Sequence, residues 1–261
     1  MSVRRGLLDD VGLVSRARER IAAARRDAEA VPSPNIWHWP EVYEAENRAQ
    51  DIDGEVWRVL AERADWTGRD VVDIGCGSGF HLPRFASLAR RVTGVEPYEP
   101  LVELARTRVA ALPTVSVAAG SAQRLPLPDA SVDVAHARTA YFFGPGCEPG
   151  LAEAERVLRP GGVLAIVDLD VRHRPYGDWM RADLPEYDPV EVDRFFARMG
   201  FESRSVETRW RFADRAGLES VLRIEFSSRV ADRAVKDVVG LSFPVGYRVL
   251  TRRKPTGLLV A

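Results

Sequence analysis

Short apolar runs alternate along the chain with segments in which apolar residues recur at helical spacing. The apolar runs predict strands over residues 71–74, 91–96, 114–119, 132–137 and 163–167. Helical spacing predicts helices over residues 81–90 and 151–158, and another around Leu101, Leu104 and Ala105. Strands that alternate with helices in this way indicate βαβ units and a parallel sheet.

The pattern continues on both sides of this region. It predicts a core-covering helix over 54–64, a helix from Asp188 to Gly200, a half-exposed strand over 203–212 and a last strand over 245–252. Residues 214–239 are typical of two helices that are broken near Ser227. Residues 171–187 have the polar composition of a loop.

The first fifty residues carry two unlike segments. Residues 13–30 are rich in Ala, Arg and Glu and predict an exposed helix. Residues 36–50 hold a dense aromatic cluster that includes Trp37, Trp39 and Tyr43. This cluster could be a lid over a ligand or a strap packed on the core, and aromatic residues at helical spacing are more often part of a core.

Composition and net charge limit the kinds of molecule that the protein is expected to bind. Hydrophobic residues make up 46% and charged residues 29% of the 261 residues, as in ordinary globular proteins. The formal net charge of −1 gives no global attraction to nucleic acid or to an anionic membrane, so neither partner is expected. Two cysteines do not form a disulfide framework, and no signal peptide or membrane-length apolar run is evident. These features predict a cytoplasmic protein.

A strand, a glycine turn and a helix follow one another at residues 71–90. The turn begins Val71-Val-Asp-Ile-Gly-Cys-Gly-Ser-Gly, and such a turn aims main-chain N–H groups and a helix N-terminus at a nucleotide-like ligand. Three further motifs come later in the chain: Gly94-Val-Glu-Pro, Gly120-Ser-Ala followed by Leu125-Pro-Leu-Pro-Asp-Ala-Ser-Val-Asp-Val, and Leu158-Arg-Pro-Gly-Gly.

In this order the motifs resemble those of the class I, Rossmann-like S-adenosylmethionine (SAM)-dependent methyltransferases, over about residues 55–252. The resemblance implies an α/β fold: a doubly wound, mostly parallel seven-stranded sheet with helices on both faces and an antiparallel last strand. An N-terminal helical cap (1–53) would precede the methyltransferase domain (54–253). That domain would carry a helical insertion at 214–240 before the last strand, and a flexible tail (254–261) would follow.

The resemblance also implies which residues hold SAM. Asp73 would lie near its ammonium group, Glu96 would accept from both ribose hydroxyls, and Pro97 and Tyr98 would border the adenine. Ala137 would offer a main-chain carbonyl. Many relatives have an acid directly after the third-loop glycine, whereas this chain has Ser121, so we expect an altered adenine contact. The full predicted cofactor set is Asp73, Gly75, Cys76, Gly77, Gly79, Glu96, Pro97, Tyr98, Ser121, Ala122 and Ala137.

Catalytic and substrate residues are predicted from their places after the fourth and fifth strands. His136, Tyr141 and His173 are the candidate catalytic side chains, and each is equally suited to a structural role. Tyr43, Arg138, Phe142 and Phe143 are the candidate substrate-binding residues, with Arg138 as an anion-binding fork between apolar walls. No metal site is predicted, although Asp168, Asp170, His136 and His173 could together bind a divalent ion.

Two other functions compete with methyl transfer to an O, N or C nucleophile of a small molecule. A nicotinamide-dependent oxidoreductase would also place an acid such as Glu96 about twenty residues after its glycines, but its fingerprint is G-x-G-x-x-G. A protein that binds SAM or its product S-adenosylhomocysteine (SAH) without turnover would share every cofactor motif. The sequence leaves open the methyl acceptor, the use of a general base and the formation of a homodimer.

Overall fold

One seven-stranded sheet organises the computed structural model, which describes residues 33–141 and 144–257. The strand order is β3-β2-β1-β4-β5-β7-β6. Strands β1 to β5 are parallel, and β7 runs antiparallel to both β5 and β6. The bounds are β1 (Asp70–Ile74), β2 (Arg91–Glu96), β3 (Val115–Ala119), β4 (Val132–Arg138), β5 (Leu158–Leu169), β6 (Glu202–Arg211) and β7 (Ser242–Arg253). The predicted mostly parallel sheet with an antiparallel last strand is confirmed.

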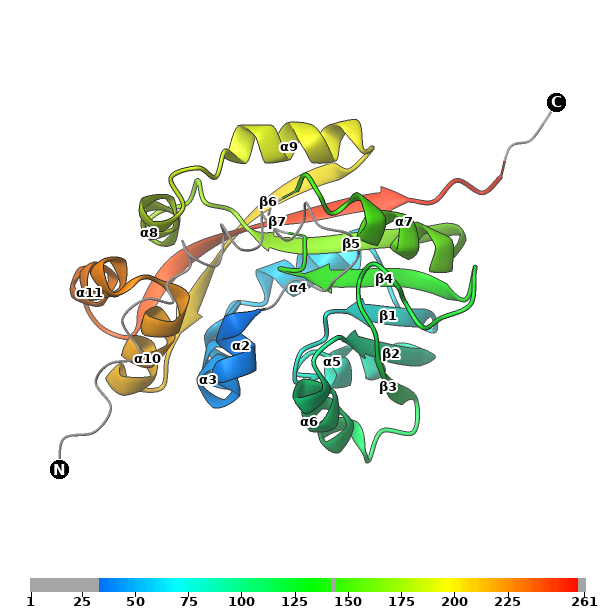
Figure 1. The fold of residues 1–261 in the computed structure, drawn as a ribbon, viewed down its shortest axis with the longest axis horizontal. Helices are drawn as coiled ribbons and strands as arrows, with labels where there is room; N and C mark the ends of the chain where they lie inside the picture. The colour runs from blue at the N-terminus through cyan, green and yellow to red at the C-terminus, as the bar shows by residue number, and fades with distance from the viewer. Residues whose placement is uncertain (1–32, 142–143, 258–261) are drawn as a thin grey trace.

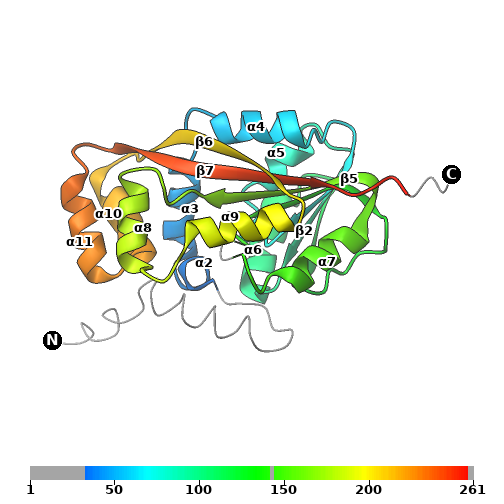
Figure 2. The same cartoon turned by 90° about the horizontal axis from the view of Figure 1, so that it is seen from above.

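Helices cover both faces of the sheet (Figure 2). One face carries α4 (Glu55–Arg63), α5 (Leu82–Ala86) and α6 (Glu99–Val109), and the other carries α7 (Glu148–Val157) and α9 (Pro189–Arg198). The division follows from right-handed crossovers, since the chain moves from β1 to β3 toward one edge and from β4 to β5 toward the other. Every residue of β1 is buried, as expected of a strand that is covered on both faces.

A second group of helices lies beyond the carboxyl ends of the central strands (Figure 1). It comprises α2 (Pro34–His38), α3 (Pro40–Ala49), α8 (Tyr176–Asp183), α10 (Arg215–Glu225) and α11 (Ser228–Asp237). Helix α3 packs on α10, and α8 packs on α11. The strand order reverses between β1 and β4, so the group stands over the sheet edge where open α/β folds bind their ligands.

Three predicted boundaries are wrong. The predicted loop at 171–187 contains α8, because Tyr176, Trp179 and Met180 recur at helical spacing and are buried. The predicted helix 81–90 is only α5, because the chain must return to start β2, where the Arg90 N–H donates to the Arg69 carbonyl at 2.8 Å. The strand predicted over 163–167 is longer, because β5 begins at Leu158 and includes the Leu158-Arg-Pro-Gly-Gly motif.

Other local predictions are confirmed. The Asp188 carboxylate caps α9 by accepting from the main-chain N–H groups of Val190 and Glu191. Residues 214–239 form α10 and α11, with the break at Ser227. At the start of the predicted tail, Lys254 donates from Nζ to the carbonyls of Glu155 and Leu158, and the flexibility of the tail stays a prediction.

The predicted helix at 13–30 lies outside the described residues. Within the described part of the chain, no helix combines the length and the hydropathy that crossing a bilayer requires.

Candidate active site

The glycine turn after β1 has a backbone that favours glycine. Gly75, Gly77 and Gly79 have φ values of +73°, +56° and +77°, a region that residues with a Cβ rarely adopt. A Cβ on Gly79 would lie 3.1 Å from the Cα of Ala105 in α6, so glycine there lets the turn pack against that helix. The turn is joined to β2, because the N–H of Gly75 donates to the Val95 carbonyl at 2.8 Å.

The Glu96 carboxylate, at the end of β2, fixes this turn. It is 4% exposed, and its Oε2 accepts from the Gly77 N–H at 3.0 Å while its Oε1 accepts from the Tyr98 N–H at 3.1 Å. Burial raises the pKa of the Glu96 carboxyl, and these two hydrogen bonds act in the opposite direction. Each carboxylate oxygen keeps a further lone pair for a ligand hydroxyl.

Asp73 and His136 form a buried pair beneath the turn. They are direct register partners in β1 and β4, and the Asp73 Oδ1 lies 2.7 Å from the His136 Nδ1. Both are almost fully buried, and the imidazole packs on Trp57 and Phe85 with ring centroids 6.4 and 4.9 Å away. His136 therefore lies inside the core on the α4–α5 side of the sheet, where it orients Asp73.

The third loop and β4 supply the remaining predicted cofactor residues. The Gly120 N–H donates to the Glu96 carbonyl at 3.1 Å, which brings the half-buried Ser121 and Ala122 next to the end of β2. Ala137 is fully buried and pairs with Ile74 of β1. The predicted set thus gathers around the carboxyl ends of β1 to β4.

The residues at this edge fit the cofactor that the sequence motifs imply. The buried Glu96 carboxylate suits ribose hydroxyls, and the Asp73 carboxylate suits an ammonium group. The glycine turn keeps the backbone free of side chains beside them. Burial raises the pKa of the Cys76 thiol within the turn, so the thiol stays neutral there.

The aromatic segment of α2 and α3 lies directly on the turn. Trp37 stacks on Tyr98 with ring centroids 4.4 Å apart and planes 14° apart, and a Cβ on Gly77 would lie 2.7 Å from the Ile36 Cδ1. From α3, the Glu44 carboxylate accepts from Arg108 Nη2 at 2.7 Å. The segment is thus bound to both the glycine turn and α6.

The candidate catalytic residues lie in three different environments. Tyr141 is buried against Gly150 of α7, and burial raises the pKa of its hydroxyl well above the ordinary range. His173 contacts β6 instead, with Nδ1 3.2 Å from Glu207 Oε2 and Nε2 3.0 Å from Ser205 Oγ. His136 is paired with Asp73, as described above. The structure does not bring these three side chains together.

The four residues considered for a divalent ion do not form one group, although His173 Nε2 lies 3.6 Å from Asp170 Oδ2. Asp170 accepts from the Nε of Arg172 at 2.7 Å, whereas His136 belongs to the pair with Asp73. Across residues 33–141 and 144–257, no group of three or more His, Cys, Asp or Glu side chains has a geometry suited to a metal ion.

A polar cluster lies between the cap helices and the end of β4. Arg138 Nη2 donates to Gln50 Oε1 at 2.9 Å, and its guanidinium lies 5.2 Å from the ring centroid of Tyr247. Tyr43 is half-buried on α3 nearby, and Phe142 and Phe143 lie outside the described residues. The structure therefore places two of the four predicted substrate residues on one cluster.

Sequence reasoning missed four members of this cluster: Glu46, Tyr176, Glu225 and Tyr247. Glu46 and Glu225 are 3% and 6% exposed, although glutamate is rarely buried without a partner. They come from α3 and α10, and no sequence motif relates these helices. Only the tertiary packing brings them together.

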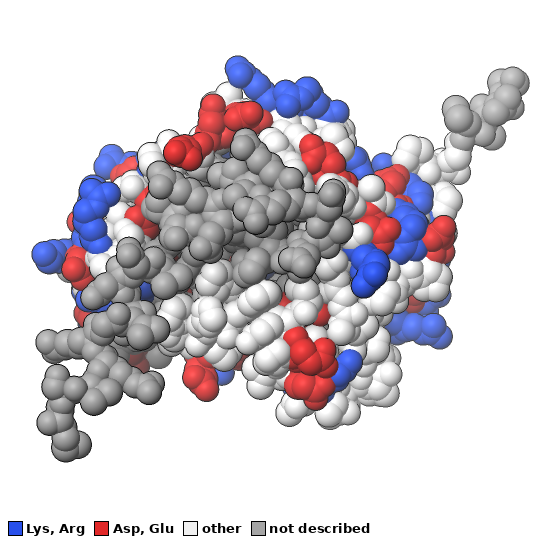
Figure 3. All heavy atoms as spheres, viewed as in Figure 1, with Lys and Arg blue, Asp and Glu red and all other residues white. Residues whose placement is uncertain are grey.

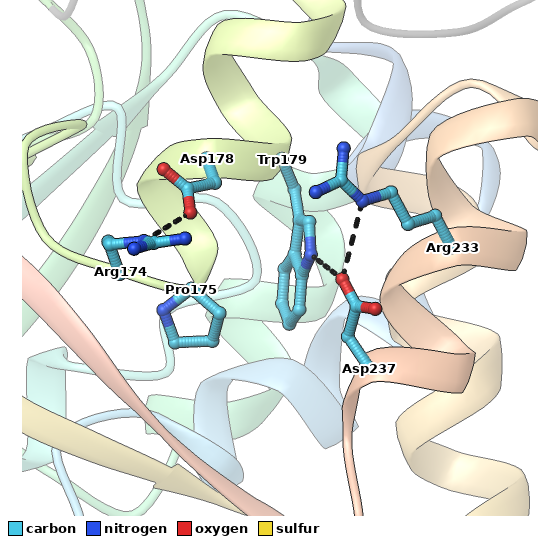
Figure 4. Close-up of a pocket in the computed structure, with 6 residues that line it drawn as sticks. All are labelled: Arg174, Pro175, Asp178, Trp179, Arg233 and Asp237. Carbon is cyan, nitrogen blue, oxygen red and sulfur yellow. Dashed lines mark hydrogen bonds and ion pairs between the residues drawn. The ribbon is translucent and has the colours of Figure 1, made fainter.

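A separate pocket of about 570 Å³ lies between α8 and α11 (Figure 4). Its charged side chains pair with one another. Asp237 accepts from Trp179 Nε1 at 2.9 Å and lies 3.5 Å from Arg233 Nε, and Arg174 pairs with Asp178. With its arginines paired, this pocket offers a ligand less charge than the sheet edge does.

Residues 72–166 match the family model described as a methyltransferase domain. An uncharacterised 37.1 kDa transposon protein of Streptomyces fradiae is 39% identical over 136 residues, which cover 50% of this chain and 36% of that protein. A Mycolicibacterium smegmatis protein named "Probable S-adenosylmethionine-dependent methyltransferase" is 40% identical over 111 residues, which cover 42% of this chain and 41% of the relative. The chain thus matches less than half the length of these relatives.

A solved SAM-dependent methyltransferase from Aquifex aeolicus shares the fold, with a TM-score of 0.52 and 23% identity over 80% of this chain and 97% of that one. The family match includes the glycine turn, Glu96 and the end of β4, which are the parts that form the sheet-edge site. Residues 72–166 are thus similar to a methyltransferase domain, and the chain is similar to SAM-dependent methyltransferases in part of its sequence and in its fold.

Proposed function

We propose that the chain transfers a methyl group from the SAM sulfonium to an O, N or C nucleophile of a small molecule, with SAH as the product. The observation that carries this proposal is the Glu96 carboxylate, which is buried at the end of β2 and hydrogen-bonded to the Gly77 N–H. The carboxylate can accept from hydroxyl groups, and it lies beside a turn of glycines at the point where the strand order reverses.

The proposed cofactor residues are those gathered at the sheet edge. Glu96 would hold the ribose, Asp73 would attract the ammonium group with His136 as its positioning residue, and Tyr98 would border the adenine. Bound SAM supplies an activated methyl group, so the protein's main task is to hold the nucleophile in line with it. A general base is needed only when that nucleophile is protonated at the working pH.

The α2–α3 segment is proposed to act as a lid. Its contacts with both sides of the site support this role: Trp37 stacks on Tyr98, and the Asn35 amide donates to Glu225 of α10. A lid in this position would keep water from the transferring methyl group. The domain division at residue 53, a cytoplasmic location and a homodimer remain predictions from the sequence.

A small-molecule acceptor also agrees with the surface. Acidic and basic side chains are interspersed around the face drawn in Figure 3, in keeping with the net charge of −1. The balanced net charge gives no global field that would attract a polyanion.

Isothermal titration calorimetry with SAH and with NADH tests the proposal. We expect SAH to bind the purified full-length chain and NADH to bind at least a hundredfold more weakly. Binding of NADH without SAH would favour the oxidoreductase. Binding of SAH without transfer of labelled methyl groups to a broad small-molecule panel would favour a catalytically silent binder.

A further inference from the structure

The Arg138 guanidinium carries a positive charge that no carboxylate of the described chain balances. Its Nη2 donates to the neutral amide of Gln50 at 2.9 Å, and its other close contact is the ring of Tyr247. Across residues 33–141 and 144–257, Arg138 forms no ion pair within 4 Å. The side chain is half-buried, and a charge that is removed from water in this way is normally paired.

The two buried acids of the polar cluster do not supply the counter-charge. Burial raises the pKa of the Glu46 carboxyl well above its ordinary range, so the group stays protonated at neutral pH. Its Oε1 accepts from Gln50 Nε2 at 2.8 Å, on the same amide whose oxygen faces Arg138. Glu225 is held by contacts of its own, which include the Tyr176 hydroxyl at 2.8 Å. Gln50 therefore joins Glu46 to the guanidinium as a neutral bridge.

The other titratable groups near Arg138 are uncharged. Tyr43 lies on α3 and Tyr247 on β7, and burial raises the pKa of both hydroxyls. Burial, and after it Arg138 itself, lowers the pKa of the His81 imidazole well below its ordinary range. Arg138 thus presents one positive charge among neutral groups, and this balance favours a ligand with one negative charge.

The Tyr247 hydroxyl provides a second donor beside the guanidinium. Its oxygen accepts from Trp210 Nε1 at 2.8 Å, and a phenol that accepts in this way still has its own proton to donate. Tyr247 is 1% exposed, so that proton is not offered to bulk water, and no oxygen of the described residues accepts it. The guanidinium carbon of Arg138 lies 5.2 Å from the centre of the Tyr247 ring, which keeps the two donors together.

Arg138 also lies next to the proposed site of methyl transfer. It ends β4 directly after Ala137, which pairs with Ile74 of β1. In the sheet, only β1 stands between β2, which ends in Glu96, and β4, so the two strands are roughly 10 Å apart. The partner amide of Gln50 is at the end of α3, in the proposed lid. A small molecule bound to Arg138 would therefore lie between the SAM site and the lid.

We propose that Arg138 and the Tyr247 hydroxyl bind a carboxylate group of the methyl acceptor. The planar guanidinium matches the two oxygens of a carboxylate and balances its single charge, whereas a phosphate monoester carries about −1.5 to −2. The rings of Tyr43 and Tyr247 suit an aromatic or apolar body beside that carboxylate.

The carboxylate is an anchor that orients the acceptor, and it is distinct from the nucleophile that receives the methyl group. Its oxygens are neutralised and hydrogen-bonded at Arg138, which makes them poor nucleophiles. Recognition makes and breaks no covalent bond. This inference rests on the proposed function, because the anchored molecule is the methyl acceptor.

Ligand-observed NMR titrations of the full-length chain test the inference with four probes: phenylacetate, 2-phenylethanol, 2-phenylethylamine and phenyl phosphate. Each probe is titrated at pH 7, with and without saturating SAH, in a buffer free of other carboxylates and phosphates. We expect phenylacetate to bind about tenfold more tightly than the alcohol and the amine, and about threefold more tightly than phenyl phosphate.

Variants of the two donors separate charge from geometry. Arg138→Met should weaken phenylacetate binding about tenfold, while the affinities for 2-phenylethanol and for SAH change less than about twofold. Arg138→Lys keeps the charge without the planar fork and should cause a smaller loss than Arg138→Met. Tyr247→Phe should weaken phenylacetate binding about threefold. Arg91→Met is the matched control, since Arg91 is exposed at the start of β2, at the opposite end of the sheet, and should leave all affinities unchanged.

Several results would overturn the inference. These are equal affinity for the alcohol, tighter binding of the amine or of phenyl phosphate, unchanged phenylacetate affinity in Arg138→Met, or no phenylacetate binding by a chain that binds SAH. The comparison of probes on the unmodified chain needs no variant to fold. Failure of SAH to bind would instead contradict the proposed function, and the titrations without SAH would still show whether the carboxylate site exists.

Discussion

The glycine turn and the polar cluster beside the α2–α3 segment form the two halves of the candidate site, and they are built differently. The turn and Glu96 belong to one βαβ unit, and their contacts are hydrogen bonds from main-chain N–H groups to one carboxylate. The polar cluster is made by side chains of α2, α3, β4, α8, α10 and β7, and its Asn35–Glu225 contact joins residues 190 positions apart. Local backbone requirements produce a sequence motif, whereas long-range side-chain contacts do not.

The largest expected effect tests whether the glycine-turn half depends on the buried contact between Asp73 and His136. His136→Phe removes the partner of the Asp73 carboxylate and leaves that charge buried alone. We expect the free energy of unfolding to fall by about 3–5 kcal/mol, measured by urea denaturation. His38→Phe, on the exposed surface of α2, is the control and should change it by less than about 0.5 kcal/mol. A loss below about 1 kcal/mol for His136→Phe would show that the pair is not needed for stability.

The second prediction concerns the carboxylate at the end of β2. Glu96→Ala leaves the N–H groups of Gly77 and Tyr98 without their acceptor and removes the proposed ribose contact. We expect SAH affinity to fall about a hundredfold, or about 2.7 kcal/mol by calorimetry. Glu99→Ala, three residues later and exposed, should retain the original affinity. A comparable loss in both variants would mean that Glu96 has no specific role.

A pair of glycine substitutions separates backbone strain from packing. Gly79→Ala and Gly68→Ala both place a Cβ at positive φ, +77° and +68°, which costs about 1–2 kcal/mol in each. Only in Gly79→Ala would the new Cβ also contact α6, at 3.1 Å from the Ala105 Cα, because Gly68 has open space around it. We expect Gly79→Ala alone to weaken SAH binding, by about tenfold. Equal SAH affinity in the two variants would contradict a specific role for the packing of the turn.

The last prediction is a pH dependence of stability that belongs to the second half. Because the folded-state pKa of Glu46 is raised above the ordinary 4.5, the folded chain holds this proton while the unfolded chain loses it. The contribution of Glu46 to stability is therefore complete below pH 4.5 and declines as the pH rises toward the folded-state pKa. The decline is at most about 1.4 kcal/mol per pH unit.

Thermal denaturation between pH 4 and pH 8 measures this slope. Glu46→Gln resembles the protonated form and should flatten it, while the exposed Glu41→Gln should not. An unchanged slope in Glu46→Gln would show that burial does not raise the pKa of the Glu46 carboxyl.

Much of the first half could be predicted from the sequence. Gly77 and Glu96 follow apolar strands at fixed spacing, and the structure places them in hydrogen-bond contact. The contact between Asp73 and His136 could be predicted from the sequence only in part. Each residue could be assigned to a strand, but their contact depends on the register between β1 and β4.

The polar cluster could not be predicted from the sequence, and the cause is physical. Tyr176 begins α8, a helix of eight residues within a stretch of polar composition, and its hydroxyl donates to a carboxylate of another helix. Glu46 and Glu225 have the amphipathic helical context of surface residues. Their burial arises only when α3 and α10 pack together.

The central claim is that the motif-encoded half binds the cofactor independently of Glu46 in the polar cluster. SAH titrations of the unmodified chain, Glu96→Ala and Glu46→Gln, carried out side by side with NADH as the competing ligand, test this claim. We predict that SAH binds the unmodified chain and Glu46→Gln within twofold of each other, and binds Glu96→Ala about a hundredfold more weakly. Binding of NADH in place of SAH, or unchanged SAH affinity in Glu96→Ala, would contradict it.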